Sequence, residues 1–311
     1  MSTMLFGRSN CEIVVECVPW SPLMEGRSSN SRPLIIKSLQ RKSVTLTQAA
    51  LERNPKAYGA SMRRKWILQH VKASSSVLQA ELALTAQFLE LDERNFHCWN
   101  HRRFVVACLA AAEANQGDES KTEYVYTGQW AEPAMGIQLV PPATSGASPP
   151  QPITDELLQT EWDFTTEKIQ DNFSNFSAFY YRSQLLPRYL RIADDTLSVW
   201  QEELQLIENA VCTEPDDQTA WWYQALLFSY DDTLFPLEAL RERLSEQGEL
   251  LRELLEDSPN SKWVLLGLHR LLEKLQIDFE EQRHILHKLQ QVDPDRSQRY
   301  QELLDSIVDV D

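Results

Sequence analysis

Apolar residues recur at spacings of three and four along most of this chain. Segments 77–91 and 197–211 follow this helical period closely. Runs of alternating β-branched residues are scarce, and long stretches rich in Leu, Ala, Glu and Gln dominate. The pattern predicts an all-α fold, with residues 1–40 as an exception because they show little helical period.

A short motif recurs along the chain and marks a repeated unit. Four copies have an aromatic residue at a fixed place, and two of these carry an arginine three residues later. The aromatic residues are Trp99, Phe179, Trp221 and Trp263, and the arginines are Arg102 and Arg182. In an upstream copy Ser61 replaces the aromatic residue, and Gln224 replaces the arginine after Trp221. Copies begin with Asn or Asp, which predicts the N-cap of a helix.

The spacing of the motif predicts how the chain is organised. The marker positions are 61, 99, 179, 221 and 263, so the steps are 38, 80, 42 and 42 residues. The long step is one period plus an insertion, and residues 114–153 are rich in Pro, Gly, Ser and Thr. We expect an atypical, poorly ordered N-terminal segment (1–40), helical repeats (41–113), an insertion or linker (114–153), and helical repeats with a C-terminal cap (154–311).

Each unit predicts a pair of antiparallel helices, because the motif begins one helix and the preceding segment supplies the other. Units of this size bury their apolar faces only against neighbours, so they stack into a solenoid. The aromatic residue and the arginine share one helical face, where a guanidinium can stack on an indole or reach neighbouring carbonyls. We therefore expect a right-handed, crescent-shaped superhelix with the motif residues packed between its hairpins.

Composition narrows the range of functions. The net charge of −16 and the pI of about 4.9 disfavour nucleic-acid binding, which needs a basic face. Five cysteines without paired spacing indicate reduced thiols in the cytoplasm. No stretch approaches the roughly 20 apolar residues that span a bilayer, so an integral membrane protein is not expected. His97 and His101 lack further ligands in the pattern of a zinc site, and no metal site is predicted.

The repeat resembles that of the protein prenyltransferase α subunits. The segments ERNFHCWNHRRFVV, NFSNFSAFYYRSQLL and DQTAWWYQALLF are closer to the Rab geranylgeranyltransferase type (type II) than to the subunit shared by farnesyltransferase and type I geranylgeranyltransferase. The resemblance covers roughly residues 40–275. It implies a crescent around a β subunit, itself an α-α barrel, and a complex that transfers geranylgeranyl to C-terminal cysteines of Rab proteins.

The same resemblance implies site residues in this chain. In the family, the lysine of an Asn-Pro-Lys-x-Tyr motif approaches the lipid diphosphate, the tyrosine lines the pocket, and an asparagine of the next repeat lies nearby. Those positions correspond to Lys56, Tyr58 and Asn95. Lys56 is the residue expected to act in catalysis, because a lysine can stabilise a departing diphosphate. Without the resemblance, the three residues would be a surface lysine, a packing aromatic and an N-cap.

The resemblance also implies the partners and cofactors. Expected partners are a prenyltransferase β subunit, a Rab escort protein, a Rab GTPase and geranylgeranyl diphosphate. Zinc is expected in the β subunit, with magnesium as a second candidate, and no cofactor is expected on this chain. Two alternatives stay open: the α subunit shared by farnesyltransferase and type I geranylgeranyltransferase, and a non-catalytic helical scaffold. The family's first repeat has no counterpart within residues 1–40.

Overall fold

The computed structural model describes residues 32–71, 74–114, 153–230 and 235–307. Within these ranges the regular structure is helical. The helices are α1 (Arg32–Arg53), α2 (Tyr58–Val71), α3 (Ser75–Leu91), α4 (Phe96–Ala114), α5 (Asp155–Asp171), α6 (Phe176–Ile192), α7 (Thr196–Thr213), α8 (Gln218–Leu227), α9 (Leu237–Asp257), α10 (Lys262–Leu275), α11 (Phe279–Val292), the 3-10 helix η2 (Pro294–Arg296) and α12 (Ser297–Ser306).

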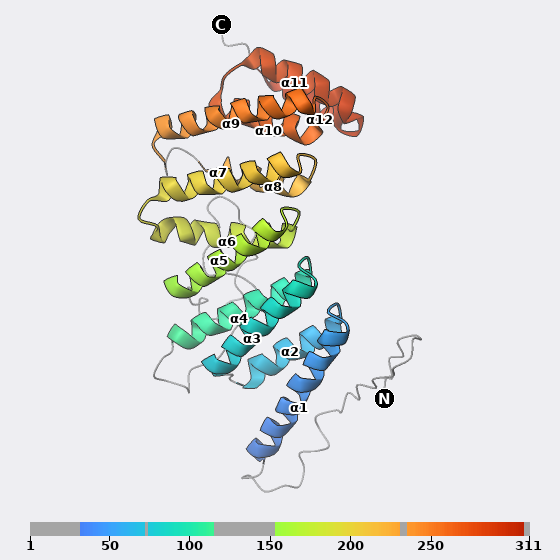
Figure 1. Cartoon of the computed structure of the whole chain (residues 1–311), viewed down its shortest axis with the longest axis vertical. Helices are drawn as coiled ribbons and strands as arrows, with labels where there is room; N and C mark the ends of the chain where they lie inside the picture. Colours follow the sequence, from blue (N-terminus) through green and yellow to red (C-terminus); the bar gives the residue numbers. More distant parts are fainter. Residues whose placement is uncertain (1–31, 72–73, 115–152, 231–234, 308–311) are drawn as a thin grey trace.

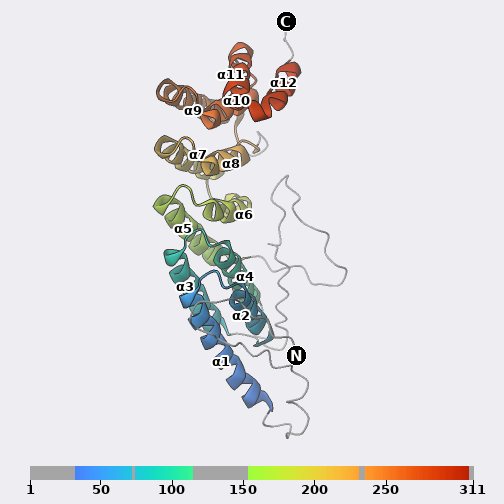
Figure 2. The same ribbon diagram turned by 90° about the vertical axis from the view of Figure 1, so that its right-hand side faces the viewer.

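Consecutive helices pack as hairpins, and the hairpins are stacked along the long axis of the molecule (Figure 1). The pairs are α1 with α2, α3 with α4, α5 with α6, α7 with α8, α9 with α10, and α11 with α12. From α2 to α10, the second helix of each hairpin also contacts the second helix of the next one. Figure 2 shows the same order from the side. The predicted all-α stack of helical hairpins is therefore confirmed.

The turn inside each hairpin is built in the same way. A backbone amide donates to the carbonyl three residues earlier in five successive turns, at residues 57, 95, 175, 217 and 261. The side chain of Asn175 then accepts from the amide of Ala178, and that of Asp217 accepts from the amide of Thr219. These bonds satisfy amides that the first helical turn leaves free. The N-cap prediction is confirmed at Asn95, Asn175 and Asp217, but not at α10, where Ser261 precedes the helix and makes no side-chain cap bond.

The fourth marker lies two residues away from the predicted position. The predicted frame places Trp263 in the aromatic position, but Ser261 precedes the first residue of α10. Counted from that cap, the position held by Trp99 and Trp221 falls on Leu265, which is buried. Trp263 is only half-buried, with the ammonium of Lys262 5.2 Å from its ring centroid. The side chain of Ser261 makes no cap bond to α10 and instead donates to Asp216 in the preceding turn, whereas the sequence pattern gives more weight to the aromatic residue.

The helical array also begins earlier than expected. Helix α1 starts at Arg32, nine residues before the predicted boundary at 41. Pro33 does not prevent this, because a missing amide in the first turn breaks no helical hydrogen bond. Residues 1–31 lie outside the described ranges, as does nearly all of the predicted insertion at 114–153. The C-terminal cap is present as α11, η2 and α12.

Replacing Gly267 by alanine is expected to lower the free energy of unfolding by about 1 to 3 kcal/mol, through overpacking. A Cβ atom at Gly267 would lie 2.3 Å from Cζ3 of the buried Trp221 ring. Gly59→Ala is the matched control, because its Cβ would meet nothing within 4 Å. In urea denaturation, a Gly267→Ala protein as stable as the Gly59→Ala protein would contradict this account.

Candidate functional site

Lys56 lies in the turn between α1 and α2, on an exposed edge of the stack. Its side chain is 73% exposed, and Nζ is 3.4 Å from Oδ2 of Asp92 in the next turn. Its backbone amide donates to the side chain of Asn54 at 3.0 Å, which fixes the turn. An exposed pair of this kind contributes little to stability. The ammonium group of Lys56 can therefore exchange Asp92 for a more strongly charged anion without loss of fold stability.

Tyr58 opens α2 beside this lysine and is 57% exposed. Its ring lies 5.2 Å from the ring of His97, which in turn lies 4.0 Å from Phe96. The three rings form an exposed aromatic group at the N-terminal ends of α2 and α4. The structure thus places Lys56 and Tyr58 on the same exposed edge.

Asn95 lies beneath that edge, and only 3% of it is exposed. Its Oδ1 accepts from the amides of His97 and Cys98, and its Nδ2 donates to the carbonyl of Pro55 at 2.9 Å. Asn175 repeats this arrangement one hairpin later, with Nδ2 donating to the carbonyl of Glu93 at 3.1 Å. Asn95 therefore ties the turn that carries Lys56 to α4. This geometry favours a positioning role over direct contact with a ligand.

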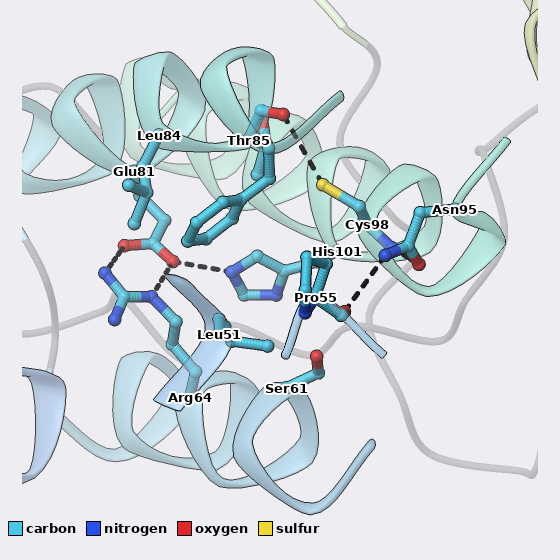
Figure 3. Close-up of a pocket in the computed structure, with 11 residues that line it drawn as sticks. Leu51, Pro55, Ser61, Arg64, Glu81, Leu84, Thr85, Asn95, Cys98 and His101 are labelled. Atoms are coloured by element: carbon cyan, nitrogen blue, oxygen red, sulfur yellow. Dashed lines mark hydrogen bonds and ion pairs between the residues drawn. The ribbon is translucent and has the colours of Figure 1, made fainter. Parts of the chain in front are cut away.

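The arginines of the motif are buried in ion pairs that join successive hairpins. We call the contact between one hairpin and the next a joint, and number the joints from the N-terminal end. In the first joint, Nη2 of Arg64 donates to Oε2 of Glu81 at 2.7 Å (Figure 3). Nη1 of Arg64 donates to the carbonyl of Val44 at 2.9 Å. The other carboxylate oxygen of Glu81 lies 2.6 Å from Nε2 of His101. Three helices, α2, α3 and α4, each contribute one side chain to this cluster.

The next two joints repeat the cluster, with tyrosine in the place of histidine. Arg102 donates to both carboxylate oxygens of Glu161, each at 2.7 Å, and Tyr181 donates to Glu161 at 3.0 Å. Arg182 donates to Glu203 at 2.6 and 2.7 Å, and Tyr223 donates to it at 2.6 Å. The guanidinium groups also stack on aromatic rings, as predicted, at 3.5 Å from Phe164 for Arg102 and 3.7 Å from Trp162 for Arg182.

The fourth joint keeps the positions but loses the charges. Gln224 and Gln247 occupy the arginine and glutamate positions, and both are buried. Gly267 occupies the tyrosine position, where the Trp221 ring takes the space. Both charged partners are thus replaced together by neutral amides, whose nitrogen and oxygen atoms have no hydrogen-bond partner within the described ranges.

The sequence pattern missed the glutamates, His101 and the two tyrosines. One signal could have revealed them: the acceptor and donor are separated by 20 residues in each of the three joints, at Glu81 and His101, Glu161 and Tyr181, and Glu203 and Tyr223. A glutamate on a helix ordinarily indicates a solvated face, so the pattern gave no reason to bury it.

Acidification is expected to destabilise the first joint. Burial lowers the pKa of His101 below its ordinary 6.5; the bond to Glu81 opposes this, and Lys65 and Arg64 add to it. Because the unfolded chain then binds the proton more tightly, stability is full above pH 6.5 and falls as the pH drops toward the folded-state pKa. The melting temperature, measured from pH 7 to 5, should fall less in His101→Tyr, a change that copies the tyrosine of the second joint.

His269 is buried and its pKa is also lowered, so His101→Tyr should reduce the pH dependence without abolishing it. An unchanged slope between pH 7 and 5 in the variant would show that His101 does not titrate with folding.

A second exposed aromatic group lies on α6 and α8. The ring of Trp222 lies 5.0 Å from Phe176 and 6.2 Å from Tyr180. Phe176 and Trp222 are 45% and 37% exposed. The guanidinium carbon of Arg103 lies 5.7 Å from the Tyr180 ring centroid, and Arg103 also donates to Gln184. Large contiguous aromatic surface beside a cation is typical of a protein interface.

The described residues show neither a cluster of metal ligands nor a membrane-spanning helix. Among them, no group of three or more His, Cys, Asp or Glu side chains is arranged to hold a metal ion. No helix in the described ranges is long and apolar enough to cross a membrane.

Known proteins resemble this chain over most of its length. The family model for the "Protein prenyltransferase alpha subunit repeat" matches residues 78–109, 158–189 and 200–231. These segments fall on the α3–α4, α5–α6 and α7–α8 hairpins. Their agreement with the observed hairpins shows that the matched repeat is the structural unit.

Curated relatives of this chain are named as subunits of a prenyl transferase. Geranylgeranyl transferase type-2 subunit alpha of Bos taurus is 34% identical over 218 residues, covering 67% of this chain and 29% of that protein. The protein of the same name from Saccharomyces cerevisiae is 28% identical over 279 residues, covering 85% of this chain and 73% of that protein. This chain thus spans less than a third of its bovine relative. The type-2 name agrees with the predicted resemblance.

A solved structure, Candida albicans protein geranylgeranyltransferase-I complexed with GGPP, covers 85% of this chain and 83% of that chain at 15% identity, with a TM-score of 0.41. That similarity is too low to support a conclusion. The repeats in three hairpins and the similarity to type-2 alpha subunits place the chain in the protein prenyltransferase alpha subunit family.

Proposed function

We propose that this chain is the α subunit of a heterodimeric Rab geranylgeranyltransferase that works in the cytoplasm. The observation that carries the proposal is the exposed Lys56 beside Tyr58, held by a turn that Asn95 fastens to the next hairpin. In this arrangement the backbone of Lys56 is held in place by the turn, while its exposed ammonium group is free to move toward an anion. A group leaving as diphosphate needs a charge of this kind as negative charge builds on it.

The division of labour follows from this arrangement. Lys56 contacts the diphosphate of geranylgeranyl diphosphate, Tyr58 lines the edge of the lipid pocket, and Asn95 positions the turn. A zinc ion in the β subunit would supply a cysteine thiolate as nucleophile. The Rab protein and its escort protein complete the assembly. The relatives named as type-2 subunits support the assignment to the α subunit of a geranylgeranyl transferase.

The β subunit is expected to dock on the exposed aromatic residues of the second helices. Phe176 lies one hairpin beyond Phe96, and Trp222 lies one hairpin beyond Phe176, near the turns that Figure 1 shows stacked along one edge. Arg103 beside Tyr180 adds a positive group to this surface in a chain of net charge −16. A partner that docks here should therefore be apolar at the contact and carry a carboxylate near Arg103.

The proposal is tested by co-expressing the chain with a type-2 β subunit and measuring the elution of the complex. A stoichiometric complex that transfers geranylgeranyl to a Rab protein supports it. Assembly only with a farnesyl-type β subunit would identify the chain as the α subunit shared by farnesyltransferase and type I geranylgeranyltransferase. Assembly with neither β subunit would favour a non-catalytic helical scaffold.

Trp222→Ala is expected to weaken the complex with the β subunit by about tenfold or more, because exposed aromatic anchors dominate interface energies. Ile192→Ala is the matched control: it is also an exposed apolar residue, 38% exposed, but lies at the opposite end of α6. Titration of labelled β subunit measures both. Equal affinities for the two variants would place the interface elsewhere.

A further inference from the structure

The first joint contains a small cavity where the other joints have a large side chain. The marker residue is buried at Trp99, Phe179, Trp221 and Leu265, but at the first copy it is Ser61. Beside Ser61 lies a cavity of about 10 Å³. This is close to the volume that a single water molecule needs.

The cavity is lined on one side by a nitrogen that lacks a partner. His101 is buried, its Nε2 bonds to Glu81, and its Nδ1 has no hydrogen-bond partner within the described ranges. Because the Glu81 carboxylate only accepts, the proton of the neutral ring lies on Nε2. Nδ1 is therefore a bare acceptor, and leaving it unsatisfied is costly.

Two more polar groups face the same space. Figure 3 shows the hydroxyl of Ser61 directed toward the side where Pro55 and the His101 ring lie. The carbonyl of Pro55 accepts from Asn95. The corresponding carbonyl of the next turn, that of Glu93, accepts two hydrogen bonds, one from Asn175 and one from the indole of Trp99. Pro55 thus has one acceptor position that the next turn fills with an indole.

We propose that this cavity is a binding site for one structural water molecule. The water donates to Nδ1 of His101 and to the carbonyl of Pro55, and it accepts from the hydroxyl of Ser61. It replaces the indole N–H that the second joint supplies to Glu93. Three hydrogen bonds are typical of a buried water. The site is specific for a small molecule with two donors, and it lies directly under the turn that carries Lys56.

A high-resolution crystal structure of the full chain with its partner tests the site. An ordered water within hydrogen-bond distance of Nδ1 and of Ser61 supports it. An empty cavity, or a His101 ring turned so that Nδ1 has a protein partner, overturns it.

A pair of variants gives the same answer in solution. Ser61→Val and Ser61→Thr have nearly the same shape, but only threonine keeps the hydroxyl. If water occupies the site, Ser61→Thr keeps the hydroxyl that donates to it and Ser61→Val does not, so Ser61→Val should melt about 2 °C or more below Ser61→Thr. If the cavity is dry, the extra methyl fills it and Ser61→Val melts at the higher temperature.

A third variant separates this effect from helix propensity. In a His101→Tyr background the bare nitrogen is gone, so the difference between the two Ser61 variants should shrink. An unchanged difference would attribute it to the helix and contradict the water site.

Discussion

Glu203→Ala is expected to lower the free energy of unfolding by about 3 to 5 kcal/mol. The substitution leaves the guanidinium of Arg182 and the hydroxyl of Tyr223 buried without their acceptor. Coulomb attraction is strong at this depth, but the greater cost comes from the stranded charge. Urea denaturation followed by circular dichroism measures the loss.

The chain itself offers the control for this prediction. In the fourth joint Gln224 and Gln247 stand at the arginine and glutamate positions. The double variant Arg182→Gln with Glu203→Gln copies that joint and removes both charges. It should be more stable than Glu203→Ala, because no buried charge is left alone. If the double variant were the less stable of the two, the stranded charge would not be the main cost.

Lys56→Ala is expected to lower the turnover number of the assembled enzyme by about tenfold to a hundredfold. The lysine is exposed and, among the residues that the structure describes, its ammonium group pairs with Asp92, so the melting temperature and the affinity for the β subunit should stay unchanged. Single-turnover transfer of geranylgeranyl from its diphosphate to a Rab protein measures the chemical step.

Arg94→Ala is the matched control for the lysine, because Arg94 holds the equivalent position in the next turn and is also exposed. Its rate should change by less than about threefold. Equal losses in both variants would indicate a general electrostatic effect of this edge on the anionic substrate. An unchanged rate in Lys56→Ala would remove Lys56 from the site while leaving the family assignment intact.

The helices and their boundaries follow largely from local chemistry. Asn175 and Asp217 cap their helices through bonds to amides two or three residues away, so the sequence alone shows where α6 and α8 begin. At α10 the same reasoning places the marker at Trp263, two residues too early, because tryptophan is a conspicuous residue and Ser261, which precedes the helix without a side-chain cap bond, is not. The start of α1 at Arg32 was missed because its apolar period is weak.

Of the site, the position of Lys56 and Tyr58 on one exposed edge could be predicted from the motif. The role of Asn95 could not, since its bond to Pro55 spans 40 residues of sequence. The buried glutamates were invisible for a related reason. Glu161 and Arg102 are 59 residues apart, and nothing near either one in the sequence indicates that they meet.

The sequence by itself thus determined the helical period, the caps, the repeat and the family, because each depends on residues within a few turns of one another or on the motif itself. Only the tertiary structure decided which charges are buried, that Asn95 is fastened to Pro55, and that Ser61 leaves a cavity beside His101. Those features depend on how one hairpin faces the next, and burial is a property of the stacked hairpins that no single segment carries.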